Sequence, residues 1–332
     1  MKRLIATVAA IAFATTFGMA PAQAKMKLKM GHLQPAISEQ GPAITHMAKR
    51  IGELTNGEIE VQVFHAAELG KSIPVQLENL VSGAQDFFIE TMDYFKAWDE
   101  RFGVINTPFV FRDRDHFKKF LASDIFADIV KKVEERGVVF IGSPNYNWMR
   151  ASYRGILSKE PIFKPTDLKG HKMRMFQAEM PIKSWGSFGN SIQVIPWADV
   201  YTSLATGVVD SLTTPLLNAY EMKFVEHAKY FTELREYYQI FAPMISTRTW
   251  KKLNTQQRDA IVKAAAEGGE IYSATSIKES VSKQIKAQNE YGVSVILPPL
   301  GPWQDHMAKV YPKFEASGDL PKGLIAKVKA IK

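Results

Sequence analysis

Strand-type and helix-type segments alternate along this chain, and the alternation limits the possible folds more than any other feature of the sequence. Residues 27–32 alternate polar and apolar side chains as a short strand does, and residues 43–54 repeat apolar side chains with helical spacing. After an Asn56-Gly57 turn, residues 58–64 alternate again. A start of strand, helix and strand predicts an α/β architecture.

The alternation continues as two successive sets of elements, which predict two lobes. In the first set we expect helices at 72–82 and 124–136 and strands at 86–89 and 138–142. In the second set we expect strands at 152–157, 172–176, 191–195 and 210–214, with helices at 181–188 and 198–206. A chain of this length usually forms about two domains. We therefore expect lobe I at 25–150 with part of 238–280, and lobe II at 151–237 with part of 281–332.

A long helical pattern extends from Thr255 to about Tyr291. As one helix it would be roughly 50 Å long, enough to brace both lobes. The Gly268-Gly269 pair inside it is equally compatible with a bend between two shorter helices. The sequence leaves both possibilities open.

The first residues have the composition of a secretory signal peptide. Lys2 and Arg3 precede a mostly apolar run that ends in Ala22-Gln23-Ala24, a small-residue cleavage motif. We therefore expect residues 1–24 to be removed after Ala24 and the mature chain to reach the periplasm. No later stretch approaches the roughly 20 uninterrupted apolar residues of a membrane span, so the exported part is expected to be soluble.

The motifs of the common catalytic chemistries do not occur in this sequence. The chain has no cysteine, its seven histidines form no close metal-ligand pair, and it has neither a P-loop nor a GxGxxG motif. The segment around Ser187 lacks a glycine two residues before the serine, which a nucleophile elbow needs. We therefore expect neither an enzyme nor a metal or cofactor site.

The formal net charge is +8, and the basic residues are scattered rather than gathered in a tract. Nucleic acid is therefore not an expected partner. A mild positive field favours the capture of small anions, although the same charge is also an ordinary solubility feature.

Three sequence blocks in the second set of elements, taken together, carry a resemblance to a known family. Residues 161–174 read PIFKPTDLKGHKMR, residues 194–201 read VIPWADVY and residues 204–210 read LATGVVD. With Leu69-Gly70 and residues 83–87, these blocks resemble the substrate-binding subunit of tripartite ATP-independent periplasmic (TRAP) transporters over essentially the mature chain. The resemblance implies a two-lobed periplasmic binding protein clamp, braced by the long helix and without a cofactor.

Three positions depart from the pattern of that family. Asp199 stands where glutamate is common, Ser203 where alanine is common and Ser211 where glycine usually follows the aspartate. These departures leave the fold and the role unaffected and the identity of the ligand open.

By the same resemblance, Arg174 at the end of the first block binds a ligand carboxylate through two points. A guanidinium suits this role because its planar fork matches a carboxylate, whereas lysine offers a single point charge. Arg154 falls where relatives carry a second ligand-facing arginine. Arg150 is close enough in the sequence to be the alternative candidate for that role. Trp197 is expected as an aromatic wall of the site or as a core residue, and Thr214 as a hydroxyl donor or an ordinary strand-end threonine.

The opposite wall is predicted from the ends of strands, where open α/β sheets tend to place binding groups. These candidates are His32 or Gln34 after the first strand, Glu90 or Thr91 after the strand at 86–89, and Asn147 and Trp148 near the crossing between the lobes.

The expected function is the capture of a small carboxylate-bearing solute. An acidic ligand docks on the lobe that carries Arg174, the other lobe closes over it by a hinge motion, and integral membrane subunits of a transporter receive it. A sugar acid, a dicarboxylate, a keto acid or a zwitterion would each suit the predicted groups. The rival functions are a binding protein of an ATP-driven importer and a periplasmic hydrolase.

Overall fold

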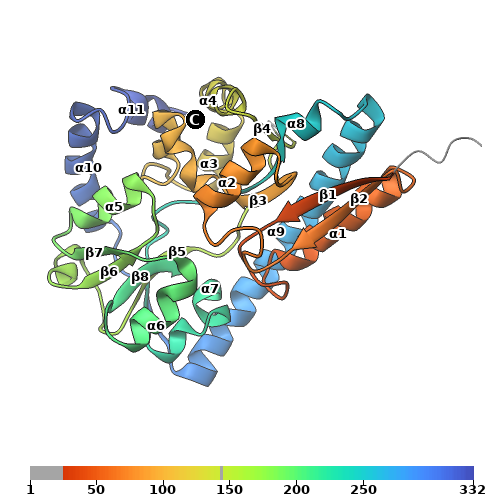
Figure 1. Ribbon diagram of the computed structural model, residues 1–332. Coiled ribbons are helices and arrows are strands. Elements are labelled where there is room, and N and C mark those ends of the chain that lie inside the picture. The colour runs from red at the N-terminus through yellow and green to blue at the C-terminus, as the bar shows by residue number, and fades with distance from the viewer. Residues whose placement is uncertain (1–24, 143–144) are drawn as a thin grey trace, which may run out of the picture.

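The structure, a computed structural model, describes residues 25–142 and 145–332. The expected signal peptide and its cleavage site after Ala24 lie outside the described residues. Two sheets form the framework, a five-stranded sheet with the order β2-β1-β3-β10-β4 and a six-stranded sheet with the order β11-β9-β5-β8-β6-β7 (Figure 1). We call the part of the chain around the five-stranded sheet lobe I and the part around the six-stranded sheet lobe II.

In lobe I, parallel strands at the start of the chain are completed by a strand that comes from far along the sequence. The strands are β1 (Met26–Gly31), β2 (Ile59–Phe64), β3 (Phe87–Thr91), β4 (Val138–Phe140) and β10 (Phe241–Ser246). The helices are α1 (Gly41–Leu54), α2 (Ile73–Ser82), η1 (Met92–Ala97), η2 (Glu100–Val104), α3 (Arg114–Leu121), α4 (Asp124–Glu134) and α8 (Thr247–Trp250). Because β10 pairs antiparallel with both β3 and β4, the chain must return to lobe I after building lobe II.

The sheet of lobe II also combines parallel and antiparallel strand pairs. Its strands are β5 (Arg154–Ser158), β6 (Lys172–Met175), β7 (Ser191–Val194), β8 (Ser211–Pro215), β9 (Tyr230–Glu233) and β11 (Ser294–Ile296). Its helices are η3 (Pro165–Leu168), α5 (Glu179–Gly186), η4 (Trp197–Asp199), α6 (Val200–Ala205), α7 (Leu216–Glu221) and η5 (Phe224–Glu226). Strand β6 lies between β7 and β8 and is parallel to both, so it is an inner strand of the sheet.

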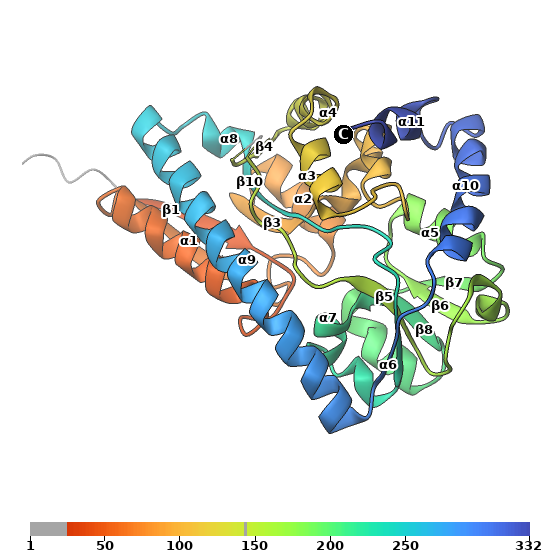
Figure 2. The ribbon, with the colours of Figure 1, turned by 180° about the vertical axis from the view of Figure 1, so that it is seen from behind.

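One helix spans both lobes. Helix α9 (Thr255–Tyr291) is continuous over 37 residues and packs against α1 of lobe I and α7 of lobe II. Asn254 begins it with a capping box, and Gly292 ends it in the left-handed conformation with φ of 69°. Seen from behind, α9 runs diagonally along the molecule past both sheets (Figure 2). The predicted brace is confirmed, and no bend is needed at the two glycines.

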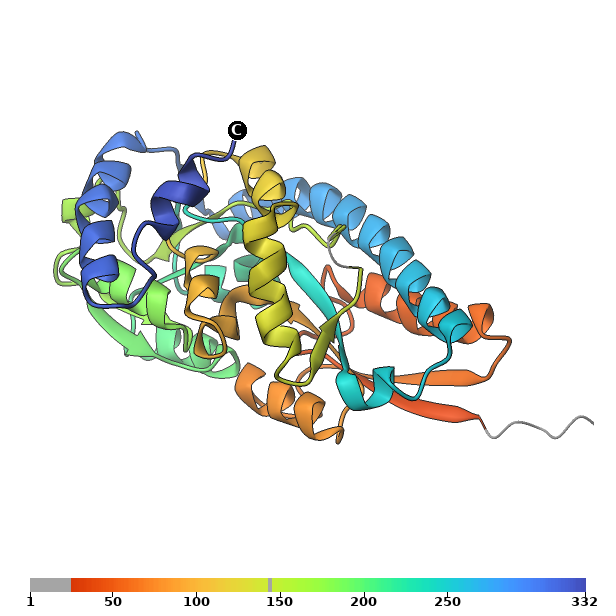
Figure 3. The ribbon, with the colours of Figure 1, turned by 90° about the horizontal axis from the view of Figure 1, so that it is seen from above.

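The C-terminal helices α10 (Gly301–Ala316) and α11 (Leu324–Lys329) also contact both lobes. Trp303 of α10 packs on Phe188 of lobe II with ring centroids 5.5 Å apart. On the side of lobe I, the Tyr311 hydroxyl donates to the carbonyl of Pro108 at 2.6 Å, and His116 contacts the carbonyl of Val328. Figure 3 shows both helices, in dark blue, side by side at one end of the molecule.

The hydrophobic core continues from one lobe into the other. A single buried cluster contains Phe102 and Phe117 of lobe I, Met173 and Trp185 of lobe II, and Trp303 of α10. Within the described residues, none of the helices is long and apolar enough to cross a membrane.

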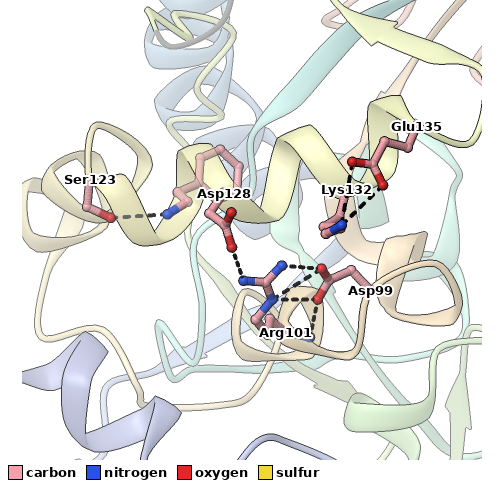
Figure 4. A network of polar contacts seen from close by, with 7 residues as sticks. Asp99, Arg101, Ser123, Asp128, Lys132 and Glu135 are labelled. Atoms are coloured by element: carbon pink, nitrogen blue, oxygen red, sulfur yellow. Dashed lines mark hydrogen bonds and ion pairs between the residues drawn. The ribbon is translucent and has the colours of Figure 1, made fainter.

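A polar network fixes η2 to α4 on the surface of lobe I. Arg101 donates to both carboxylate oxygens of Asp99 and, from Nη1, to Asp128 of α4 (Figure 4). Its guanidinium is therefore occupied by protein carboxylates, as is usual for an arginine with a structural role.

Candidate functional site

A cavity of about 90 Å³ lies where the two lobes meet. At roughly 10–15 Å³ for each water molecule, it has room for a small solute but not for a polymer. Its lining comes from lobe I (Leu33, Gln34, Ile73, Glu90, Thr91, Tyr94), from the segments crossing between the lobes or just beyond them (Arg150, Gln239, Phe241) and from lobe II (Arg154, Arg174, Phe176, Trp197, Thr213, Thr214, Pro215, Asn218).

Arg174 is the most unusual group in this cavity. It lies on the inner strand β6, and only 4% of its surface is exposed. Its Nε donates to the carbonyl of Ile195 at 2.9 Å, and its guanidinium carbon lies 5.4 Å from the ring centre of Trp197. Among the residues that the structure describes, no carboxylate forms an ion pair with Arg174 and no acceptor bonds to its two Nη groups.

Burial lowers the pKa of Arg174 to about 10, and the positive charge of Arg154 contributes to the decrease. The guanidinium still carries its charge at neutral pH. A buried cation with two open donor groups is chemically suited to bind an anion, because burying a charge without a partner is costly.

Arg154 and Arg150 have partners of their own. Arg154 bonds through Nε to Glu236 at 3.2 Å and through Nη2 to the carbonyl and hydroxyl of Thr213. Arg150 bonds through Nε to Glu39 at 2.7 Å. The two arginines also share the Oε1 atom of Gln239, at 3.2 and 2.6 Å.

Both arginines are thus held by acceptors on the protein. Burial raises the pKa of Glu236, and the charge of Arg154 opposes that rise. Burial alone lowers the pKa of Arg150, but Glu39 and Tyr272 together outweigh this effect and hold the pKa above its ordinary value.

The remaining wall of lobe II combines an aromatic surface with polar groups. Trp197 lies beside Arg174 and also packs against Phe224, with ring centroids 5.0 Å apart, so this partly buried ring lines the cavity and contacts the core of lobe II. Thr214 lies near the end of β8, and Asn218 follows in the first turn of α7. The Oδ1 of Asn218 is buried and has no hydrogen-bond partner among the described residues.

The wall from lobe I is built at strand ends, as expected. Glu90 and Thr91 end β3, and Gln34 follows β1. The Oε1 of Glu90 accepts the backbone N–H of Thr91 at 2.9 Å. The ring of Tyr94, from η1, lies 5.7 Å from that of Phe176 on lobe II, so the two walls touch beside the cavity.

The sequence matches a family model described as "Bacterial extracellular solute-binding protein, family 7" over residues 30–317. The chain belongs to this family. It is a substrate-binding subunit of a TRAP transporter, a transport protein and not an enzyme. Proteins of this family are periplasmic and act together with membrane transporter subunits.

Individual relatives match this chain over almost its whole length. The sialic acid-binding periplasmic protein SiaP of Vibrio cholerae is 25% identical over 97% of this chain and 98% of its own length. A TRAP solute-binding protein of Sulfurospirillum deleyianum with bound succinate is 26% identical, covers 93% and 99% of the two chains and superposes with a TM-score of 0.83. One from Chromohalobacter salexigens with bound D-glucuronate is 21% identical over 92% and 100%, with a TM-score of 0.84.

Three of the residues singled out in the sequence of this TRAP subunit do not line the cavity. His32 is 1% exposed and turns away to bond His65, with 2.7 Å between its Nε2 and His65 Nδ1. Asn147 and Trp148 face α9 instead, donating to the carbonyls of Ala266 and Ala265 at 2.7 and 2.8 Å. They attach the crossing segment to the long helix.

Several cavity residues were not singled out in the sequence, namely Tyr94, Phe176, Asn218 and Gln239. Asn218 and Phe176 follow β8 and β6, so the strand-end rule that selected Glu90 also applies to them. Gln239 lies in the second crossing segment, and nothing in its local sequence marks it. Among the described residues, no group of three His, Cys, Asp or Glu side chains is arranged to hold a metal ion.

Proposed function

We propose that this TRAP subunit captures a small carboxylate-bearing solute between its lobes, with the two Nη groups of Arg174 holding the carboxylate. The observation that carries the proposal is the state of Arg174, which is buried, charged and bonded through only one of its three nitrogens to described residues. A carboxylate accepts two parallel N–H bonds from such a fork and neutralises the buried charge.

The other cavity groups suit a ligand with further polar atoms. Gln34, Thr91, Thr214 and Asn218 offer uncharged donors and acceptors around the cavity. Trp197 provides an apolar face beside the bound carboxylate. The relatives with bound succinate and D-glucuronate, both carboxylates, support this ligand class.

Closure of the lobes follows from where these groups lie. Gln34 and Glu90 belong to lobe I, whereas Arg174 and Asn218 belong to lobe II, so a bound solute contacts both walls. Contacts made only in the shut form stabilise that form. The closed protein is then the form that the membrane subunits receive.

Small-angle scattering tests the closure. The radius of gyration is expected to fall when a saturating ligand is added, because the two lobes approach each other. An unchanged radius with ligand bound would contradict hinge closure.

Export requires removal of residues 1–24, as the composition of the leader predicts. Mass spectrometry of protein released from the periplasm is expected to give a chain that begins at Lys25. A full-length chain retained in the membrane fraction would contradict cleavage after Ala24.

Substitution of Arg174 tests the carboxylate clamp. A thermal-shift screen over acidic metabolites first finds a ligand, since a solute that binds the folded state raises its stability. Calorimetric titration is then expected to show binding weakened by about 2–5 kcal/mol in Arg174→Met, which is roughly thirty-fold to several-thousand-fold. Arg174→Lys should lose less, because it keeps the charge and loses the fork.

Arg101→Met is a matched control, since Arg101 is bonded to Asp99 and Asp128 on the surface of lobe I. Its affinity for the same ligand is expected to equal that of the wild type. Unchanged affinity in a folded Arg174→Met protein would overturn the proposed function.

A further inference from the structure

Three guanidinium groups line the cavity, but two of them already have a carboxylate of their own. Arg150 pairs with Glu39 at 2.7 Å and Arg154 with Glu236 at 3.2 Å. The side chains of both glutamates are fully buried, and neither glutamate is part of the cavity lining. Each pair therefore cancels one positive charge from behind the cavity wall.

Arg174 is left as the one cation of the lining without a carboxylate among the described residues. No lysine or histidine of the described chain belongs to the lining, and Glu90 adds a carboxyl group on the opposite wall. The cavity thus offers unmatched positive charge to one anionic group only.

We infer that this cavity accepts a solute with one carboxylate and no second anionic group, and that Glu236 and Glu39 set this limit. The inference rests on the proposed role of Arg174. The rest of the solute meets the uncharged groups of Gln34, Thr91 and Asn218, which suit hydroxyl and keto oxygens.

A second carboxylate on the solute would find no further cation in the lining that lacks a carboxylate partner. It would lose its hydration in the closed cavity without a charged partner. A second carboxylate that bound Arg154 would have to break the ion pair between Arg154 and Glu236. This would cost free energy, because Glu236 would then remain fully buried and unpaired. Dicarboxylates and phosphorylated carboxylates are therefore excluded by charge, even where their length fits.

Matched acids test the inference on the wild-type protein, which needs no substitution. D-erythronate is compared with meso-tartrate, and D-gluconate with D-glucarate, by calorimetric titration at pH 7.5. In each pair the chain length is the same, and the second member carries one more carboxylate. We expect the best-binding monocarboxylate to bind at least about thirty-fold more tightly than its dicarboxylate partner.

Glu236→Gln tests the origin of the preference. Glutamine keeps the size and an acceptor oxygen, but it leaves the charge of Arg154 unmatched. The dicarboxylate is then expected to gain about ten-fold or more relative to its monocarboxylate partner. Glu233→Gln is the matched control, because Glu233 lies three residues earlier and pairs with the exposed Arg235 outside the cavity. It should keep the wild-type ratio.

The outcomes separate the two proposals. Tighter binding of meso-tartrate or D-glucarate that is lost in Arg174→Met would overturn the one-carboxylate limit and leave the clamp intact. A ratio that is the same in Glu236→Gln and Glu233→Gln would overturn the role of Glu236. Binding of any of these acids that is unchanged in a folded Arg174→Met protein would overturn the proposed function itself.

Discussion

Gly269 of α9 lies directly against the side chain of Asn147, so closely that a Cβ atom at this glycine would come within 2.0 Å of Asn147 Oδ1. Gly268 has the same relationship to Trp148, with 2.7 Å from an added Cβ to the ring atom Cζ2. Both partners donate to backbone carbonyls of the preceding turn of α9. The glycines therefore let the crossing segment lie on the long helix, and they do not mark a bend.

Substitution of Gly269 by alanine gives the test of this packing. In an open helix alanine is more favourable than glycine by about 1 kcal/mol. Here the added methyl group overlaps Asn147, so we expect Gly269→Ala to lower the free energy of unfolding by about 1–3 kcal/mol in urea titrations. Gly301→Ala, at the open start of α10 where nothing lies within 4 Å, should be neutral or slightly stabilising. Increased stability of Gly269→Ala would contradict the close-packing role.

The layered fold was predictable because its signal is local. The alternation at 58–64 and the helical spacing at 43–54 correspond to β2 and α1, and the predicted helix from Thr255 to Tyr291 is α9. Pairing between distant segments has no such signal. Nothing in residues 241–246 indicates that β10 inserts between β3 and β4, and this insertion is what brings the chain back to lobe I before α9 leads it to lobe II again.

The same limit applies to the cavity. The resemblance to the family singled out Arg174, Trp197 and Thr214, and the structure places all three on the lining. The pairing of Arg150 with Glu39 joins residues 111 positions apart. Because such partners depend on tertiary packing, the sequence was unable to show which of the arginines is left without a carboxylate.

Glu221, at the end of α7, makes stability depend on pH. Burial, with a further contribution from Glu39, raises the pKa of Glu221 to about 7 from 4.5. Between these values the folded state binds more protons than the unfolded state, so stability falls as the pH rises through this window. The loss contributed by this group is at most about 3 kcal/mol and is complete near pH 8.

Urea unfolding of Glu221→Gln and of the wild type between pH 4.5 and 8 measures this contribution. The free energy of unfolding of the variant should increase relative to that of the wild type as the pH rises, because glutamine carries no charge. The exposed Glu68→Gln should follow the wild type throughout. A constant difference between Glu221→Gln and the wild type over this range would contradict the raised pKa.

His32 has the opposite dependence. Burial, with repulsion from His65 as a smaller cause, lowers the pKa of His32 to about 3. Its contribution to stability is present above the unfolded pKa of about 6.5 and is lost as the pH falls towards 3, with a slope of up to about 1.4 kcal/mol per pH unit. Ring NMR signals of His32, assigned with a His32→Gln variant, are expected to stay in the neutral form from pH 8 to pH 5. A titration midpoint near 6.5 for these signals would contradict the lowered pKa of His32.

Arg174 is expected to lower the stability of the ligand-free protein. Its guanidinium is buried and charged and lacks a carboxylate partner among the described residues, which is the state that a bound ligand would relieve. Removing the charge in Arg174→Met should therefore raise the free energy of unfolding of the ligand-free protein by about 0.5–2 kcal/mol, as is common when a functional group is replaced by an apolar one.

Arg154→Met is the matched control for that prediction and should change stability in the opposite direction. Arg154 is as deeply buried as Arg174, but its loss leaves Glu236 without its ion pair, which typically costs about 3–5 kcal/mol. Urea titrations of the two variants without ligand compare them directly. If Arg174→Met were destabilised as strongly as Arg154→Met, Arg174 would be a structural residue with a protein partner, and the cavity would have no unoccupied cation to offer a solute.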